Sequence, residues 1–135
     1  MTDRRDFLKT SAAAAALLTL GAATTSRAGD RPAFSGIVYT SDNPGQWAKK
    51  VGSHAPQVTV DKDKVTIVTR HPMSAAHYIV RHTLVLADGT VIGGTTFSPA
   101  DSPESTYTLP AGYSGRLYAT SFCNKHDFWL TETSV

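Results

Sequence analysis

The chain has 135 residues, with 13 lysines and arginines against 11 aspartates and glutamates, and a single cysteine. This length is enough for one domain with one modest hydrophobic core. The positive balance comes from the first 28 residues, since the remainder carries nine basic and nine acidic residues. A neutral remainder argues against a nucleic-acid partner or an anionic membrane surface, both of which need a clustered basic face. One cysteine also excludes an intramolecular disulfide.

The N-terminus is typical of a twin-arginine export signal. It has a paired arginine, an alanine-rich apolar run and small residues that suit a signal peptidase: Arg4-Arg5, residues 11–23 and Ser26-Arg27-Ala28. The apolar run is too short to span a bilayer. We therefore predict that residues 1–28 are a removed signal and that residues 29–135 form a single periplasmic domain. The twin-arginine translocase would be the export partner; it carries folded proteins, so a metal can be loaded before export.

The rest of the chain mostly alternates apolar and polar residues, with turn residues at regular spacing, as short strands do. The segments that fit are residues 34–39, 58–60, 65–68, 78–87, 91–92, 106–109, 116–122 and 128–133. Between them the sequence predicts a turn or helical piece at 43–50, a charged hairpin tip at 61–64, a tight turn at Asp88-Gly89 and a loop at 98–103. The fold expected is an all-β sandwich of about seven or eight short strands.

Five candidate metal ligands fall at strand ends or in loops of this map. Cys123 and His126 form a Cys-x-x-His motif late in the chain. His71 and His77 bound a second cluster, and His54 lies in a polar loop. A free thiol in an oxidising compartment is usually lost or occupied, so this thiol calls for a partner. Four imidazoles and one thiolate together predict a metal site.

The fifth histidine, His82, is set apart by strand parity. It shares a predicted strand face with Tyr78, Val80, Leu84 and Leu86, whereas His77 has the opposite parity and stands where the strand begins. We therefore expect His82 to be packed or partly exposed and not a ligand, unless a bulge breaks the parity.

The ligand set narrows the choice of metal. Imidazoles suit zinc, copper, iron and nickel, but five protein ligands exceed the tetrahedral set of zinc. Five ligands also leave one position open, as a redox metal needs to bind a small oxidant. Blue copper is the competing interpretation, with two histidines, one cysteine and a weak axial methionine. Met73 is the only methionine after the signal and precedes Cys123; the copper alternative stays open because the axial ligand can be replaced.

Together these motifs resemble the iron domain of the superoxide reductases, the neelaredoxin and desulfoferrodoxin family. The resemblance covers about residues 49–130. It rests on His54-Ala55-Pro56, on His71-Pro72-Met73 with His77, and on Cys123-Asn124-Lys125-His126 followed by Trp129. With one cysteine the chain has no four-cysteine rubredoxin-like site, so it resembles the single-iron, neelaredoxin type.

The resemblance implies an immunoglobulin-like β-sandwich with a mononuclear non-haem iron that cycles between ferrous and ferric states. It implies an axial sulfur from Cys123, opposite an open position, and four equatorial nitrogens, from His54, His71, His77 and His126. The implied activity is one-electron reduction of superoxide to hydrogen peroxide, with an external donor that re-reduces the iron. A homo-oligomer is also implied.

The sequence departs from the family just before His54. Family members commonly have Glu-Lys-His there, where the Glu ligates ferric iron and the Lys attracts superoxide and helps deliver protons; this chain has Gly52-Ser53-His54. We predict that Lys49 or Lys50 replaces that lysine, with two solvated lysines as the alternative. Lys125 has the same two interpretations, a lysine that acts on superoxide or a solvated lysine. Asn124 is expected to shape the ligand loop and support the thiolate.

Two other functions stay open. One is a periplasmic electron carrier, bearing either copper or an iron that has lost reductase activity. The other is a non-catalytic binding module whose histidines are incidental. A hydrolase is not indicated, because the serines and threonines lack a nucleophile motif and the acidic residues are scattered.

Overall fold

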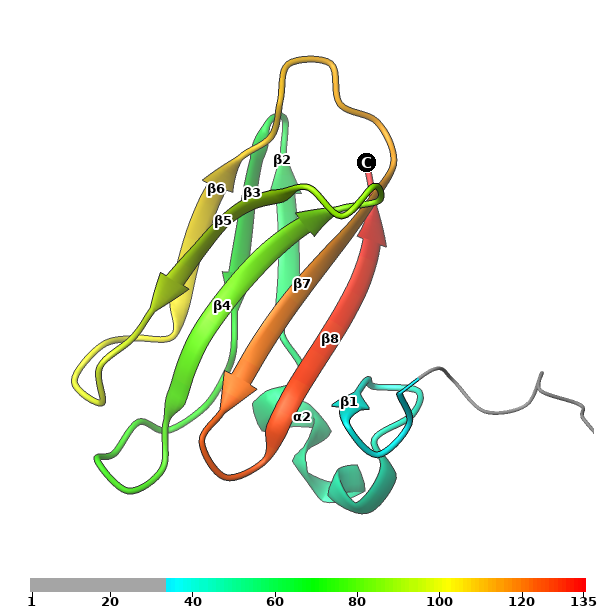
Figure 1. The fold of residues 1–135 in the computed structure, drawn as a ribbon. Helices are drawn as coiled ribbons and strands as arrows, with labels where there is room; N and C mark the ends of the chain where they lie inside the picture. Colours follow the sequence, from blue (N-terminus) through cyan, green and yellow to red (C-terminus); the bar gives the residue numbers. More distant parts are fainter. Residues whose placement is uncertain (1–33) are drawn as a thin grey trace, which may run out of the picture. The chain divides into compact units, whose positions relative to one another are not determined.

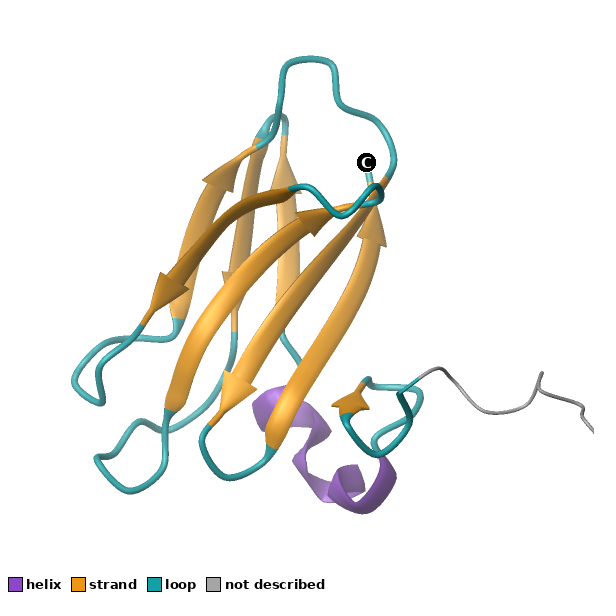
Figure 2. Ribbon diagram, in the orientation of Figure 1, coloured by secondary structure: helices purple, strands orange, loops and turns teal. Residues whose placement is uncertain are grey.

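The computed structural model describes residues 34–135, which form eight strands in two facing sheets (Figures 1 and 2). The larger sheet has the order β1-β8-β7-β4-β5, made of Val38–Tyr39, Asp127–Ser134, Arg116–Cys123, Ile79–Leu86 and Val91–Thr96. The smaller sheet has the order β2-β3-β6, made of Gln57–Asp61, Lys64–Val68 and Glu104–Thr108. The predicted all-β sandwich is confirmed. The predicted signal and the start of the predicted mature domain lie outside the described residues.

The core lies between the sheets and follows the alternation of the strands. In β7, every second residue from Leu117 to Cys123 is buried. The main apolar cluster joins both sheets and consists of Val65, Ile67, Leu84, Leu86, Leu109, Leu117 and Ala119. Because successive side chains of a strand point to opposite faces, this alternation places Cys123 at the end of the buried face of β7.

Two short helices connect β1 to β2 near one end of the sandwich (Figure 1). A 3₁₀ helix, η1, spans Gly45–Lys50, and α2 spans Val51–His54. Gly45 has a φ of 52°, and a Cβ there would lie 3.0 Å from the ring of Tyr39, so the start of η1 requires glycine. The predicted helical piece exists but continues to His54. The expectation that His54 lies in a loop was wrong, since it ends a helix.

Two further strand predictions need correction. Only Val38–Tyr39 of the predicted 34–39 strand pairs with β8; Phe34 to Ile37 form a turn in which the Ile37 N–H donates to the Phe34 carbonyl. In β4 a bulge lies between Ile79 and Arg81. Because of the bulge, Ile79 is completely buried while Val80 is only half-buried. The predicted buried face, which alternates through the even-numbered residues, is therefore found from His82 onward but not before it.

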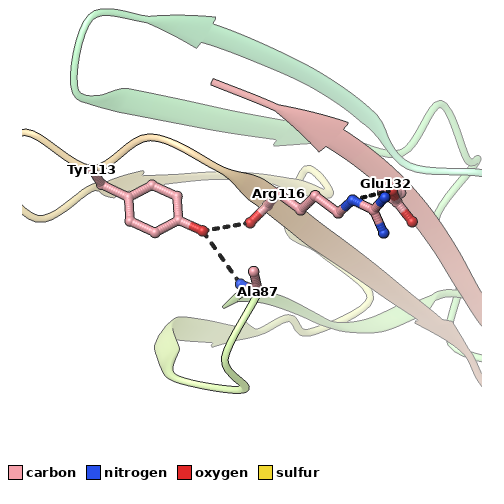
Figure 3. Close-up of polar contacts among 4 residues, drawn as sticks. All are labelled: Ala87, Tyr113, Arg116 and Glu132. Atoms are coloured by element: carbon pink, nitrogen blue, oxygen red, sulfur yellow. Dashed lines mark hydrogen bonds and ion pairs between the residues drawn. The ribbon is translucent and has the colours of Figure 1, made fainter.

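The end of β7 opposite Cys123 is held by Tyr113 (Figure 3). Its hydroxyl donates to the Arg116 carbonyl over 2.7 Å and accepts from the Ala87 N–H over 3.3 Å. Arg116 also pairs with Glu132 across β7 and β8, but both side chains are exposed and such pairs contribute little to stability. Tyr113 thus ties the start of β7 to the end of β4.

Candidate metal centre

The late ligand motif lies in the turn between β7 and β8. Cys123 is buried at the end of β7, and its Sγ lies 3.6 Å from Nδ1 of His126. The turn closes through Asp127, which has a φ of 62°. The indole N–H of Trp129 donates to the His126 carbonyl over 3.0 Å. A fully buried tryptophan therefore fixes the backbone of this turn.

The second cluster is the loop before β4. The Nε2 atoms of His71 and His77 lie 3.1 Å apart, and Nε2 of His77 lies 3.0 Å from Nδ1 of His126. Asn124 joins this loop to the late turn. Its side-chain oxygen accepts from the Tyr78 N–H and its amide nitrogen donates to the Ala76 carbonyl, so it holds both neighbours of His77. Asn124 was expected to shape the late turn and support the thiolate; its side chain instead bonds to the loop of His77.

His54 completes the group from the end of α2. Its Nδ1 lies 2.8 Å from the Ser53 hydroxyl and 3.2 Å from the Lys50 carbonyl. A proton on Nδ1 satisfies these acceptors and leaves the lone pair of the ring on Nε2. Nε2 is buried and finds no hydrogen-bond partner among the described residues. A buried polar atom without a partner is costly, so this nitrogen has the environment of a metal ligand.

The four imidazoles surround a common centre. Neighbouring ring centroids lie 4.5 Å (His54–His71), 4.4 Å (His71–His77), 4.7 Å (His77–His126) and 4.6 Å (His126–His54) apart, with steep angles between the planes. The diagonal pair His54 and His77 is farther apart, at 5.8 Å, and nearly stacked. The four rings thus form a closed, roughly square ring of neighbours that could hold a metal together.

The distances between donor atoms also fit a metal. Two nitrogens bound at right angles, each about 2.1 Å from a metal, lie about 3.0 Å from each other. The His77 Nε2 contacts of 3.1 and 3.0 Å match that value. One possible ligand atom from each of His54, His77, Cys123 and His126 lies within 4.8 Å of all the others. His71 is outside this set of four and joins it through its Nε2, which lies 3.1 Å from that of His77. The mixed nitrogen and sulfur chemistry of these residues fits iron.

All four histidines are biased toward the neutral form. Burial, and then the charges of His71 and His126, lower the pKa of His54 to about 4. The pKa values of His71, His77 and His126 are also lowered, in each case first by burial and then by neighbouring charges. A neutral imidazole has the lone pair that a metal needs, so the site is prepared for a cation at neutral pH.

The lysines differ in their relation to the site. The charge of Lys50 helps to lower the pKa of His71, His77 and His126, and that of Lys125 acts on His77 and His126. Lys49 is exposed and is not among the charges that act on these rings. Of the two adjacent lysines, Lys50 is therefore the one whose charge acts on the imidazoles.

Met73 is placed next to the site without joining the donors. It packs with Ile79, Phe97 and Cys123, and its sulfur accepts the Ile79 N–H over 3.4 Å. A thioether committed to this hydrogen bond is a poor axial ligand, which weakens the blue-copper alternative.

Three contacts near the site were not foreseen from the sequence. They are the Ser53 hydroxyl on His54, the Asn124 bridge to the His77 loop, and the edge of Trp47, whose ring centroid lies 4.6 Å from that of His126. Only the first had a usable signal, because Ser53 is adjacent to a candidate ligand in the sequence. The other two link residues that are 46 to 79 positions apart.

His82 lies outside the donor group, as expected from its parity. It is fully buried, and each ring nitrogen lies 2.9 Å from a hydroxyl, Nε2 from Thr69 and Nδ1 from Ser105. Both nitrogens are occupied, so neither is available to a metal.

The burial of His82 gives a pH-dependent stability. Burial lowers the pKa of His82 to about 4, whereas an unfolded histidine titrates near about 6.5. As the pH falls, the unfolded state binds this proton first, so the stabilisation is complete above about pH 6.5 and is lost toward about pH 4, by up to about 3 kcal/mol. Urea unfolding of the metal-free protein at about pH 7.5 and about pH 4.5 measures the loss. His82→Gln does not titrate and should lose less over the same range; an equal loss would contradict the assignment.

Comparison with protein families agrees with this geometry. The family model for desulfoferrodoxin matches residues 46–132, and the model for the twin-arginine translocation signal matches residues 1–21. The signal indicates export to the periplasm. Within residues 34–135, no helix has the length and apolar character needed to cross a membrane.

Similar solved structures belong to the same group. The superoxide reductase (neelaredoxin) from Ignicoccus hospitalis is 29% identical over 77% of this chain and 98% of its own, with a TM-score of 0.64. A variant of that protein gives 28% identity, coverage of 78% and 98%, and a TM-score of 0.68. The superoxide reductase from Treponema pallidum is 27% identical over 62% of this chain and 69% of its own, with a TM-score of 0.53.

A search of curated protein sequences found no match. The family model nevertheless covers most of the chain, including every residue of the candidate metal centre. The chain therefore belongs to the desulfoferrodoxin family.

Proposed function

We propose that this protein is an exported superoxide reductase, with one iron held by Cys123 and four histidines, His54, His71, His77 and His126. The observation that carries the proposal is the square of imidazoles with a buried thiol beside it. When bound, a ferrous ion supplies the electron that converts superoxide and two protons to hydrogen peroxide, and a thiolate ligand favours the oxidised metal. An external donor returns the electron.

The protein's own residues orient the donors and hold the charge around them. Ser53 and the Lys50 carbonyl fix the tautomer of His54, Asn124 holds the His77 loop, and Trp129 holds the backbone of His126. Lys50 and Lys125 place positive charge near His77 and His126, where it attracts an anionic substrate. Lys50 replaces the lysine that the family carries next to the first histidine.

The proposal is tested by metal analysis of the mature protein purified without oxygen, followed by rapid mixing of the ferrous form with superoxide. We expect about one iron per chain and oxidation that depends on superoxide. Copper in place of iron would point to the electron carrier. Iron that superoxide does not oxidise would remove the reductase activity, and a metal-free chain of equal stability would favour a binding module.

The role of Lys50 has a matched control in its neighbour. Lys50→Ala should slow the reaction with superoxide about tenfold at low ionic strength and weaken its salt dependence, because a steering charge is lost. Lys49→Ala removes the same charge one residue away and should react nearly as the wild type does. Equal rates and equal salt dependence in the two variants would exclude steering by Lys50.

Self-association is the remaining proposal about partners. Large apolar side chains, Ile37 and Phe128, are 63% and 47% exposed beside the paired strands β1 and β8. Exposed apolar groups of this size support a homo-oligomer, which sedimentation of the mature protein would detect.

A further inference from the structure

Behind the donor group, the sandwich contains a chain of hydrogen-bonded polar side chains. His82 Nδ1 lies 2.9 Å from the Ser105 hydroxyl, and His82 Nε2 lies 2.9 Å from the Thr69 hydroxyl. The Thr69 hydroxyl in turn lies 2.9 Å from that of Ser121. All four residues are buried, with at most 6% of any of them exposed.

These residues occupy positions that the core would otherwise fill with apolar side chains. His82 stands on the buried face of β4 in line with Leu84 and Leu86, and Ser121 stands on the buried face of β7 in line with Ala119. An apolar set of similar shape stabilises such a position as well as a hydrogen-bonded set does. A fully satisfied polar chain is instead suited to fixing one arrangement of the segments that it joins.

The segments that it joins carry two of the proposed ligands. Thr69 precedes His71 by two residues, and the His71 N–H donates to the Thr69 carbonyl over 2.8 Å, a tight turn that couples their positions. Ser121 precedes Cys123 by two residues on the same buried face of β7. The Thr69–Ser121 contact therefore connects the loop after β3, in the smaller sheet, with β7, in the larger sheet.

His82 determines the orientation of this contact. A neutral imidazole donates from one nitrogen and accepts at the other, so the direction of each hydroxyl is set along the chain. The Thr69 hydroxyl has one proton, so it donates to one of His82 and Ser121 and accepts from the other. Ser105 lies at the far end, on β6, and touches neither ligand-bearing segment through its hydroxyl.

We propose that Thr69, His82 and Ser121 are positioning residues that hold His71 in place relative to Cys123. The inference rests on the proposed iron site but not on its reaction with superoxide. Loss of this contact lets the loop of His71 move against β7 and changes the distance between the His71 imidazole and the Cys123 thiol, which would both hold the iron. The consequences are weaker retention of iron and an altered thiolate-to-iron charge-transfer band.

The test compares three variants with the wild type. Thr69→Val and Ser121→Ala remove the contact between the two ligand segments, whereas Ser105→Ala removes only the far end. In the first two variants we expect iron to pass to a chelator about 10 to 100 times more readily, which is the range found when residues that support a ligand are removed. We also expect their ferric charge-transfer band to shift. Ser105→Ala should change urea unfolding of the metal-free protein but leave the band in place.

A second pair of variants keeps the test decisive if Thr69→Val does not fold. His82→Gln offers an amide nitrogen near the position of Nε2 and should keep the Thr69 contact and the wild-type band. His82→Asn offers an amide nitrogen near the position of Nδ1, so it keeps only the Ser105 contact. Because the Thr69 contact is lost, the band should shift. Unchanged bands and chelator rates in Ser121→Ala and His82→Asn would overturn the proposal. A wild-type protein without iron would instead overturn the proposed function.

Discussion

Replacing Cys123 with serine is expected to abolish the charge-transfer band of the ferric protein and most of its reaction with superoxide. Cys123 is the single cysteine of the chain and supplies its sole thiolate. A serine hydroxyl is not ionised at neutral pH and gives no thiolate-to-metal transition. We expect iron affinity to fall by more than about 100-fold, beyond the effect of losing a residue that only supports a ligand.

Met73→Leu is the matched control for Cys123→Ser. It removes the other nearby sulfur, which packs against Cys123, and leucine conserves the volume at a cost below about 1.5 kcal/mol. The spectrum and the superoxide rate should survive. A band retained by Cys123→Ser and lost in Met73→Leu would assign the sulfur ligand to the methionine and revive the copper alternative.

Truncation of Trp129 to alanine is expected to give the largest loss of stability, about 3 to 5 kcal/mol in the free energy of unfolding. Its ring is fully buried, and the ring centroid lies 5.7 Å from that of Tyr39 and 5.9 Å from that of His54. The same substitution frees the His126 carbonyl. Chemical unfolding of the metal-free protein measures the first effect, and chelator competition measures the second.

Trp129→Phe separates the two roles of this side chain. Phenylalanine keeps most of the buried apolar surface but has no N–H, so the loss should be about 1 to 3 kcal/mol, from the lost hydrogen bond to the half-buried His126 carbonyl and from the smaller ring. It should still release iron faster than the wild type. Iron retention equal to the wild type would show that the indole hydrogen bond does not support His126.

Periodicity in the sequence was enough to predict the sandwich and most of its turns, although β5, predicted as 91–92, extends to Thr96. Alternation predicts β3, β4 and β7 to within one or two residues, because each strand buries one face only. It failed where backbone geometry interrupts the pattern. Phe34, with a φ of 63°, turns the chain where a strand was predicted, and the β4 bulge reverses the facing of Ile79.

For the site, residue type predicted the candidates and the fold supplied their arrangement. The spacing of Cys123 and His126 fits one turn, but no pattern places His54 against His71. Which of Lys49 and Lys50 acts on the imidazoles depends on the phase of a 3₁₀ helix, and two adjacent lysines in a sequence do not reveal that phase. The two partners of His82 come from β6 and from the loop after β3, so only tertiary structure shows that it is hydrogen-bonded through both nitrogens.

The proposed ligands come from both sheets, since His71 follows β3 and Cys123 ends β7. A bound ion would therefore act as a cross-link between the two layers and close a large loop of the chain, which restricts the unfolded ensemble as a disulfide does. The protein has no disulfide to do this, because Cys123 is alone. Loss of the ion would first cause local opening of the ligand-bearing end of the sandwich. Amide hydrogen exchange should then be faster there than at the end held by Tyr113.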